Sequence, residues 1–390
     1  MLVKQYNNVR LAGVLFAFLF ALSGCATTEN HNLAEFESND KGSLPEISFF
    51  YSWPSDALRN ECRQFDESSV MNHCLINNIS GYEYFDSLRR TKMFQKVKLA
   101  DEQTEYQVEY ATAWMHGENA ADISKAAVAG ATLLMVPVSM EKQIKAEVNV
   151  YWRGKVIEQL TYDLPHVSTL SLFHDPQAGN RNFTDTLTSH FLKDVQEKQI
   201  FTPQFLSKKL NSSDYETRLQ APEASGDFAL AGKFIYNSPF LGASLRYHHK
   251  QFADDYIDVF VYPVKKASWE DSAAVIKQEL AFIRKEIDIV KKEQAWLSAE
   301  FGEDIAFAWQ YEGQDFQGFY FDGVIQRQDE EESYTSTYAF IKKDKVIKFR
   351  TTFPAQFSMA FVKHIMSEIE VPEESVFMAK IRLDAENKTL

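Results

Sequence analysis

The alternation of apolar and polar residues predicts an α+β protein. Apolar residues spaced by three and four predict helices at residues 81–94 and 183–195. Apolar residues at every second position predict strands at 106–110, 141–152 and 155–162. The turn Arg153-Gly154 suits a hairpin between the last two strands. We therefore expect a mostly antiparallel sheet packed with helices in this half of the chain.

The second half repeats this pattern around a long predicted helix at residues 268–301, with Ser268 as its candidate N-cap. The predicted strands lie at 228–236, 242–248, 256–262, 305–311, 317–325, 334–342 and 345–353, and a last helix at 354–368. Polar residues 211–226 interrupt the periodicity and are predicted as a linker. The two α+β domains then span residues 44–210 and 227–390.

The order of elements in residues 227–390 resembles the α-β-α sandwich of the PsbP family, which also includes bacterial lipoproteins. The resemblance rests on the succession of strands, long helix, antiparallel strands and helix. It implies a sheet with helices on both faces. No short motif accompanies it.

The N-terminal segment has the pattern of a secretory signal. Lys4 and Arg10 precede an apolar run at residues 11–22, and small residues follow it. Twelve apolar residues are too few to span a membrane, which takes roughly 20. We expect residues 1–24 to be a signal peptide that is removed.

The end of this segment, Leu22-Ser23-Gly24-Cys25, resembles the lipobox of bacterial lipoproteins. The resemblance implies cleavage before Cys25, a diacylglycerol thioether on its thiol, and a fatty acid such as palmitate on the new amino terminus. Ala26 and Thr27 replace the Asp that retains such proteins in the inner membrane. In a Gram-negative bacterium this implies the outer membrane, and we expect its periplasmic side rather than the cell surface. The alternative is an ordinary secreted protein with an unmodified Cys25.

Composition narrows the set of partners. The net charge is −14, and it becomes about −16 once Lys4 and Arg10 leave with the signal peptide. A surface this acidic repels phosphate backbones, so we expect no nucleic-acid partner. Residues 25–43 are polar and acidic, and they are predicted to form a flexible, lipidated spacer.

Two cysteines remain beside Cys25. In an oxidising periplasm, Cys62 and Cys74 are expected to form a disulfide. Two other interpretations stay open. One is a zinc site with His73, although no second Cys or His pair stands at ligand spacing, and the other is two free thiols.

The sequence offers little catalytic chemistry. It contains no nucleophile elbow, phosphate-binding loop, dinucleotide fingerprint or H-E-x-x-H motif. The pair His248-His249, followed by Asp254 and Asp255, is the most ligand-like cluster, but adjacent residues on a strand point to opposite faces. The acidic run at 329–332 is typical of a solvated turn. We expect no metal and no cofactor.

Two apolar regions are candidates for partner binding. Residues 120–136 are small and apolar, and we expect them to pack onto the first sheet, with a membrane-facing or partner-facing patch as the alternative. Val275, Phe282 and Ile289 lie off the main apolar stripe of helix 268–301, so we predict that they form a partner surface.

The expected function is that of a non-catalytic, lipid-anchored envelope protein. It would bind other envelope proteins or assist assembly at the outer membrane. A periplasmic carrier of a small apolar ligand is the alternative, and an enzyme of an unrecognised class comes third.

Overall fold

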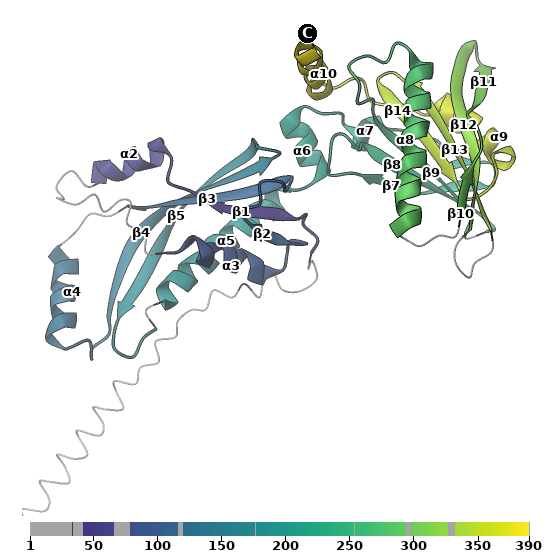
Figure 1. Ribbon diagram of the computed structural model, residues 1–390. Coiled ribbons are helices and arrows are strands. Elements are labelled where there is room, and N and C mark those ends of the chain that lie inside the picture. The colour runs from purple at the N-terminus through teal and green to yellow at the C-terminus, as the bar shows by residue number, and fades with distance from the viewer. Residues whose placement is uncertain are drawn as a thin grey trace, which may run out of the picture. The chain divides into compact units, whose positions relative to one another are not determined.

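The computed structural model describes residues 33, 42–65, 79–115, 120–175, 177–252, 254–293, 298–326 and 332–389. These residues form an α+β fold with two compact units, Met1–Lys193 and Asp194–Leu390. Figure 1 shows one sheet in each unit. No helix among these residues has both the length and the apolar composition needed to cross a membrane.

The first unit is built on a five-stranded sheet with the order β2-β1-β3-β4-β5. The strands are β1 (Ile47–Tyr51), β2 (Val97–Leu99), β3 (Tyr106–Met115), β4 (Val138–Trp152) and β5 (Lys155–Leu170). The long pairings β3·β4 and β4·β5 are antiparallel, whereas β1 runs parallel to β2 and β3. Arg153 and Gly154 both have positive φ, which confirms the predicted hairpin turn.

Helices α3 (Gly81–Thr91) and α5 (Ala178–Lys198) supply the aromatic core of the first unit. The Tyr84 ring meets Tyr110 of β3 and Phe183 of α5 edge-on, with centroids 5.9 and 6.4 Å apart. All three residues are buried. The helices at α2 (Asp56–Phe65) and α4 (Ala120–Ala131) complete this unit.

The second unit is built on a nine-stranded antiparallel sheet with the order β10-β12-β13-β14-β9-β8-β7-β6, and β11 also pairs with β12. Its strands are β6 (Ala224–Ser225), β7 (Phe228–Ile235), β8 (Ala243–His249), β9 (Tyr256–Pro263), β10 (Ser298–Phe301), β11 (Ile305–Tyr311), β12 (Gln314–Gln326), β13 (Ser333–Lys342) and β14 (Lys345–Thr351). Its remaining helices are α6 (Pro203–Leu210), α7 (Tyr215–Arg218), α8 (Ser272–Glu293), α9 (Ala355–Glu368) and α10 (Val376–Thr389).

Two helices cover opposite faces of this sheet. Tyr338 and Phe340 belong to the cluster that includes α9, whereas Ala339 between them belongs to the cluster with Leu280 of α8. Neighbouring residues on a strand point to opposite faces, so α8 and α9 must lie on different sides. The layers are those of the expected α-β-α arrangement.

The prediction of a helix over residues 268–301 was wrong at both ends. It begins at Ser272, where the Asp271 carboxylate accepts a hydrogen bond from the Ala274 amide, and it ends at Glu293. Residues 298–301 instead form β10, and the Phe301 ring lies where a side chain on Gly323 would stand. Pairing with β12 therefore decides the backbone of this segment, which the apolar spacing alone cannot.

The first residues of the predicted linker 211–226 form part of the second unit. The Asp214 carboxylate caps α7 by accepting bonds from the Glu216 and Thr217 amides. Tyr215 and Leu219 belong to the same buried cluster as α9. Within the predicted spacer 25–43, Leu33 is buried.

Candidate functional site

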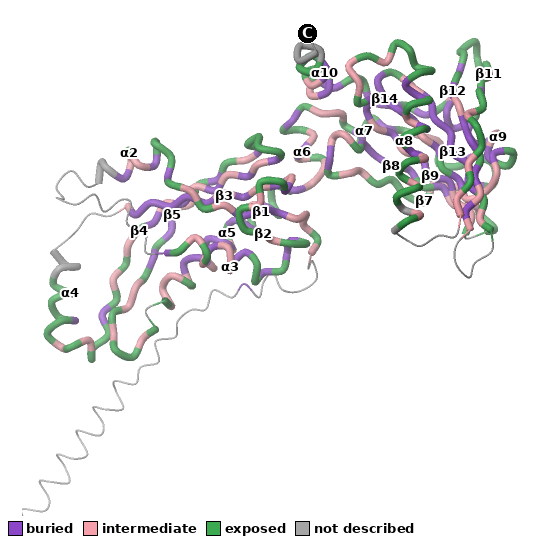
Figure 2. Tube along the Cα trace, in the orientation of Figure 1, coloured by how far each residue is buried: buried purple, intermediate pink, exposed green. Residues whose placement is uncertain are grey.

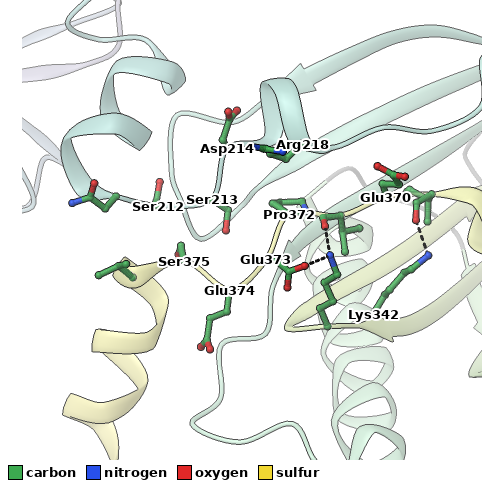
Figure 3. Close-up of a pocket in the computed structure, with 15 residues that line it drawn as sticks. Ser212, Ser213, Asp214, Arg218, Lys342, Glu370, Pro372, Glu373, Glu374 and Ser375 are labelled. Atoms are coloured by element: carbon green, nitrogen blue, oxygen red, sulfur yellow. Dashed lines mark hydrogen bonds and ion pairs between the residues drawn. The ribbon is translucent and has the colours of Figure 1, made fainter.

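The second unit has a cleft of about 890 Å³ between the start of α7, the β13–β14 turn and the segment that joins α9 to α10. Figure 3 shows its charged and hydroxyl side chains. They come from three separate parts of the chain: residues 211–218, 342–343 and 369–376.

Two lysines at the end of β13 hold one wall of the cleft. Lys342 donates a hydrogen bond to the carbonyl of Ile369 at 2.7 Å, and Lys343 donates to that of Val371 at 3.0 Å. Burial lowers the pKa of Lys342, and the neighbouring Lys343 charge lowers it further. The two ammonium groups therefore attach the segment after α9 to the sheet.

Several acidic and hydroxyl groups of the cleft also have structural partners. Glu373 pairs with Lys343, and Glu374 pairs with Arg382. Asp214 caps α7, and the Ser375 hydroxyl accepts the Met378 amide near the start of α10.

A buried charge cluster lies next to this cleft. Asp344, Lys345 and Arg382 are all buried. Asp344 contacts both cations, and Arg382 also donates to the carbonyls of Val264 at 2.7 Å and Lys266 at 3.2 Å. The Trp269 ring covers the guanidinium at 4.3 Å. Burial lowers the pKa of Lys345, and Asp344 opposes that shift.

No pattern in the sequence marks this cleft or the charges beside it. Lys342 and Glu374 belong to no motif and lie far apart in the chain. Ser375 before α10 is a recognisable N-cap, so that helix was detectable. The cleft was not, because its walls meet only through the tertiary fold.

The histidine pair does not assemble a metal site. His248 packs near the Tyr256 ring, and the His249 ring nitrogen accepts the amides of Gln251 and Phe252. Among the described residues, no three His, Cys, Asp or Glu side chains are grouped to hold a metal. The histidines support a loop at the end of β8.

The predicted partner residues on α8 divide into two kinds. Val275 is buried against Val264 and Val346, so its expected exposure was wrong. The first turn of α8 packs against the end of β9 and the start of β14. Its buried face is therefore wider there than the main apolar stripe, and it includes Val275. Phe282 and Ile289 are exposed at 53% and 56%.

The expectation that residues 120–136 pack onto the first sheet holds in part, because α4 contacts β4 of that sheet. Ala129 is buried, but Val128, Leu133, Met135 and Val136 are exposed. Figure 2 shows exposed residues along the described part of α4 and the loop that follows it. The segment thus buries Ala129 and leaves four of its larger apolar side chains in solvent.

The cysteines are described only in part. Cys62 is buried on α2 and disulfide-bonded. Cys74 and Cys25 lie outside the described residues, so the partner of Cys62 and the lipidation site stay predictions. Residues 329–331 of the acidic run also lie outside them.

Comparison of the sequence with protein-family models and with curated proteins gave no match. Among solved structures, the solution structure of the cyanobacterial PsbP protein CyanoP from Synechocystis sp. PCC 6803 matches 40% of this chain and 92% of its own, with 14% identity and a TM-score of 0.25. The crystal structure of PA94, a protein of unknown function from Pseudomonas aeruginosa, matches 39% of this chain and 95% of its own, with 12% identity and a TM-score of 0.18. The likeness to PsbP is therefore weak and covers part of the chain.

Proposed function

We propose that this chain is a lipid-anchored protein of the bacterial envelope that binds another envelope protein and has no catalytic role of its own. The anchor would be Cys25, within the lipobox-like sequence, and would hold the protein on the periplasmic side of the outer membrane. The observation that supports partner binding is the pair of exposed apolar residues Phe282 and Ile289 on α8.

These two residues lie on one side of the helix. They are seven positions apart, which is about two helical turns. The other side of α8 is attached to the sheet through Ile276, Leu280 and Ile283. Two apolar side chains on an otherwise polar helix face make a small surface, which suits a transient partner rather than a permanent subunit.

The chemistry of the cleft supports binding over catalysis. Its carboxylates would favour an enzyme if they were free to move protons, but three of the four, Asp214, Glu373 and Glu374, are engaged in a helix cap and two ion pairs. The same charged lining is unsuited to a small apolar ligand. The interaction protein is therefore the function we favour.

In-cell crosslinking of the full-length protein, followed by mass spectrometry of its adducts, tests this proposal. The double variant Phe282→Asp/Ile289→Asp should lose specific crosslinks and keep its far-UV circular dichroism and its unfolding temperature. Phe357→Asp is the matched control, because Phe357 is 66% exposed on α9 of the same unit. Its crosslinks should remain.

Two results would contradict the proposal. One is a double variant that folds normally and keeps every crosslink. The other is a measurable turnover that disappears when a single His or carboxylate in the cleft region is replaced, which would establish an enzyme instead.

A further inference from the structure

Two uncharged segments of the first unit meet at the far end of the β4–β5 hairpin. The Leu172 amide donates to the Leu134 carbonyl at 3.0 Å. The hydroxyls of Ser139 and Thr169 lie 3.1 Å apart, next to the paired strand ends Val138 and Leu170. The loop after α4 and the loop after β5 therefore form one surface. We call it the apolar tip, defined by Val128, Leu133, Met135, Val136, Val167, Leu170, Leu172 and Phe173.

The side chains of the apolar tip project into solvent. Phe173 is 79% exposed and Leu133 75%, while Met135 and Leu172 are both 63% exposed. A side chain that keeps this much of its surface free lies in no groove of its own protein. Single exposed apolar residues are ordinary on a protein surface, but eight on adjoining parts of α4, β5 and the loops that follow them are not.

The backbone of the tip holds Leu133 in a left-handed C-cap conformation, with its side chain exposed to solvent. The Leu133 amide donates to the Gly130 carbonyl and the Leu134 amide to the Ala129 carbonyl, as in a Schellman C-cap of α4. Leu133 stands at the position that usually holds Gly, with φ of 50°, and Leu134 follows with φ of 61°. This conformation is unfavourable for leucine, and a chain that needed only the turn would use Gly or Asn.

The tip lacks the charged residues and the aromatic anchors that a protein partner would use. Residues 127–140 and 164–173 contain no Asp, Glu, Lys or Arg, although a quarter of the whole chain is charged. They also contain no Tyr or Trp, which together with Arg are the usual anchors of protein interfaces. The hydrocarbon region of a membrane accepts projecting Leu, Met and Phe side chains without complementary pockets or hydrogen bonds.

We propose that the apolar tip inserts into a phospholipid bilayer. This contact goes beyond the proposed lipid on Cys25 and does not depend on it. The first unit would then touch the membrane surface directly, which would restrict its orientation while the second unit remains available to a protein partner.

Vesicle binding of the unlipidated protein tests the insertion. The probe is the whole mature chain with Cys25→Ser, exported by a signal peptide that is not a lipoprotein signal, and mixed with phosphatidylcholine or phosphatidylcholine/phosphatidylglycerol vesicles. It should float with both kinds of vesicle. Leu133→Asn/Phe173→Ser should lower the partition coefficient at least about tenfold, because each buried Leu or Phe side chain contributes about that factor or more. Phe357→Ser, on the second unit, should leave it unchanged.

Folding and insertion are separable in these variants. Asn tolerates the left-handed conformation at position 133, so Leu133→Asn should unfold at the same or a higher urea concentration than the parent. A second readout is tryptophan fluorescence. The emission maximum of Phe173→Trp should shift to shorter wavelength when vesicles are added, and that of Phe357→Trp should not.

Three results would overturn the proposal. The unlipidated chain stays in the lipid-free fraction, or the folded Leu133→Asn/Phe173→Ser variant floats as well as the parent, or a photo-crosslinker at position 173 attaches to a protein and to no lipid. Labelling of the native chain with radioactive palmitate tests the lipid anchor independently. A negative result for bilayer insertion of the tip can therefore be distinguished from a negative result for lipidation of Cys25.

Discussion

Arg382 of α10 and Asp344 of the β13–β14 turn form a buried ion pair, with the guanidinium Nη1 3.1 Å from the carboxylate Oδ2. The same Asp344 carboxylate also meets Lys345, which has no exposed surface. One carboxylate thus contacts two buried cations, and Glu374 supplies a second negative charge to Arg382. The pair also holds the C-terminal helix against the sheet, 38 residues away in the chain.

Replacing this carboxylate should be strongly destabilising. In Asp344→Asn, Lys345 and Arg382 lose their shared counterion in a buried site, where an uncompensated charge costs about 3–5 kcal/mol. Urea unfolding of the second unit, followed by circular dichroism, measures the loss. Glu373→Gln is the matched control, since Glu373 is 80% exposed in its pair with Lys343 and should cost about 1 kcal/mol or less. Equal midpoints for Asp344→Asn and the parent would contradict this account.

Stability of the first unit should fall in mild acid because of His166. Burial lowers the pKa of this imidazole, which contacts Trp114 and lies 3.1 Å from the Asn180 side-chain oxygen. As the pH falls through the ordinary His pKa of about 6.5, the unfolded chain binds a proton before the folded one does. The free energy of unfolding should therefore decrease from about pH 7.5 downward until the folded pKa is passed.

The matched variants for this pH effect are His166→Gln and His174→Gln. Glutamine does not titrate and keeps an amide near Asn180, so His166→Gln should flatten the pH dependence of unfolding between about pH 5 and 7.5. His174→Gln is the matched control, a replacement of a half-buried histidine in the same unit that leaves His166 in place. Parallel pH profiles for the parent and His166→Gln would show that another group is responsible.

The disulfide prediction concerns Cys62, which is buried and bonded, and Cys74, its expected partner. Alkylation of unreduced protein followed by intact-mass measurement should add no alkyl group to either residue. Cys62→Ser/Cys74→Ser should lower the unfolding free energy by roughly 3 kcal/mol, the loop-closure effect of a short disulfide loop. Modification of both thiols without reductant would disprove the pairing.

The lipidation prediction concerns Cys25 alone. A thioether forms only on a cysteine side chain, so Cys25→Ser should abolish incorporation of radioactive palmitate and leave an uncleaved precursor on a denaturing gel. Ser23→Thr is the control and should be labelled and processed. Undiminished labelling of Cys25→Ser would mean that the fatty acid, if present, is attached elsewhere.

The sequence by itself determined most of the elements. The spacing of apolar residues located both domains' long strands, the hairpin at Arg153-Gly154 and the helices that became α3, α5, α8 and α9. This was possible because a helix or strand buried on one face repeats its apolar residues with the period of its own backbone. Motifs near the N-terminus supplied the predicted anchor.

Only the tertiary structure decided which apolar residues are covered. Val275 and Phe282 lie on the same helix outside its main stripe, yet one is buried on strand ends and the other is exposed. Leu133 resembles a core residue in sequence but caps α4 in solvent, and Lys345 resembles a surface residue but is fully buried beside Asp344. Burial depends on which distant segment lies across a residue, and the local period of a sequence contains no information about that neighbour.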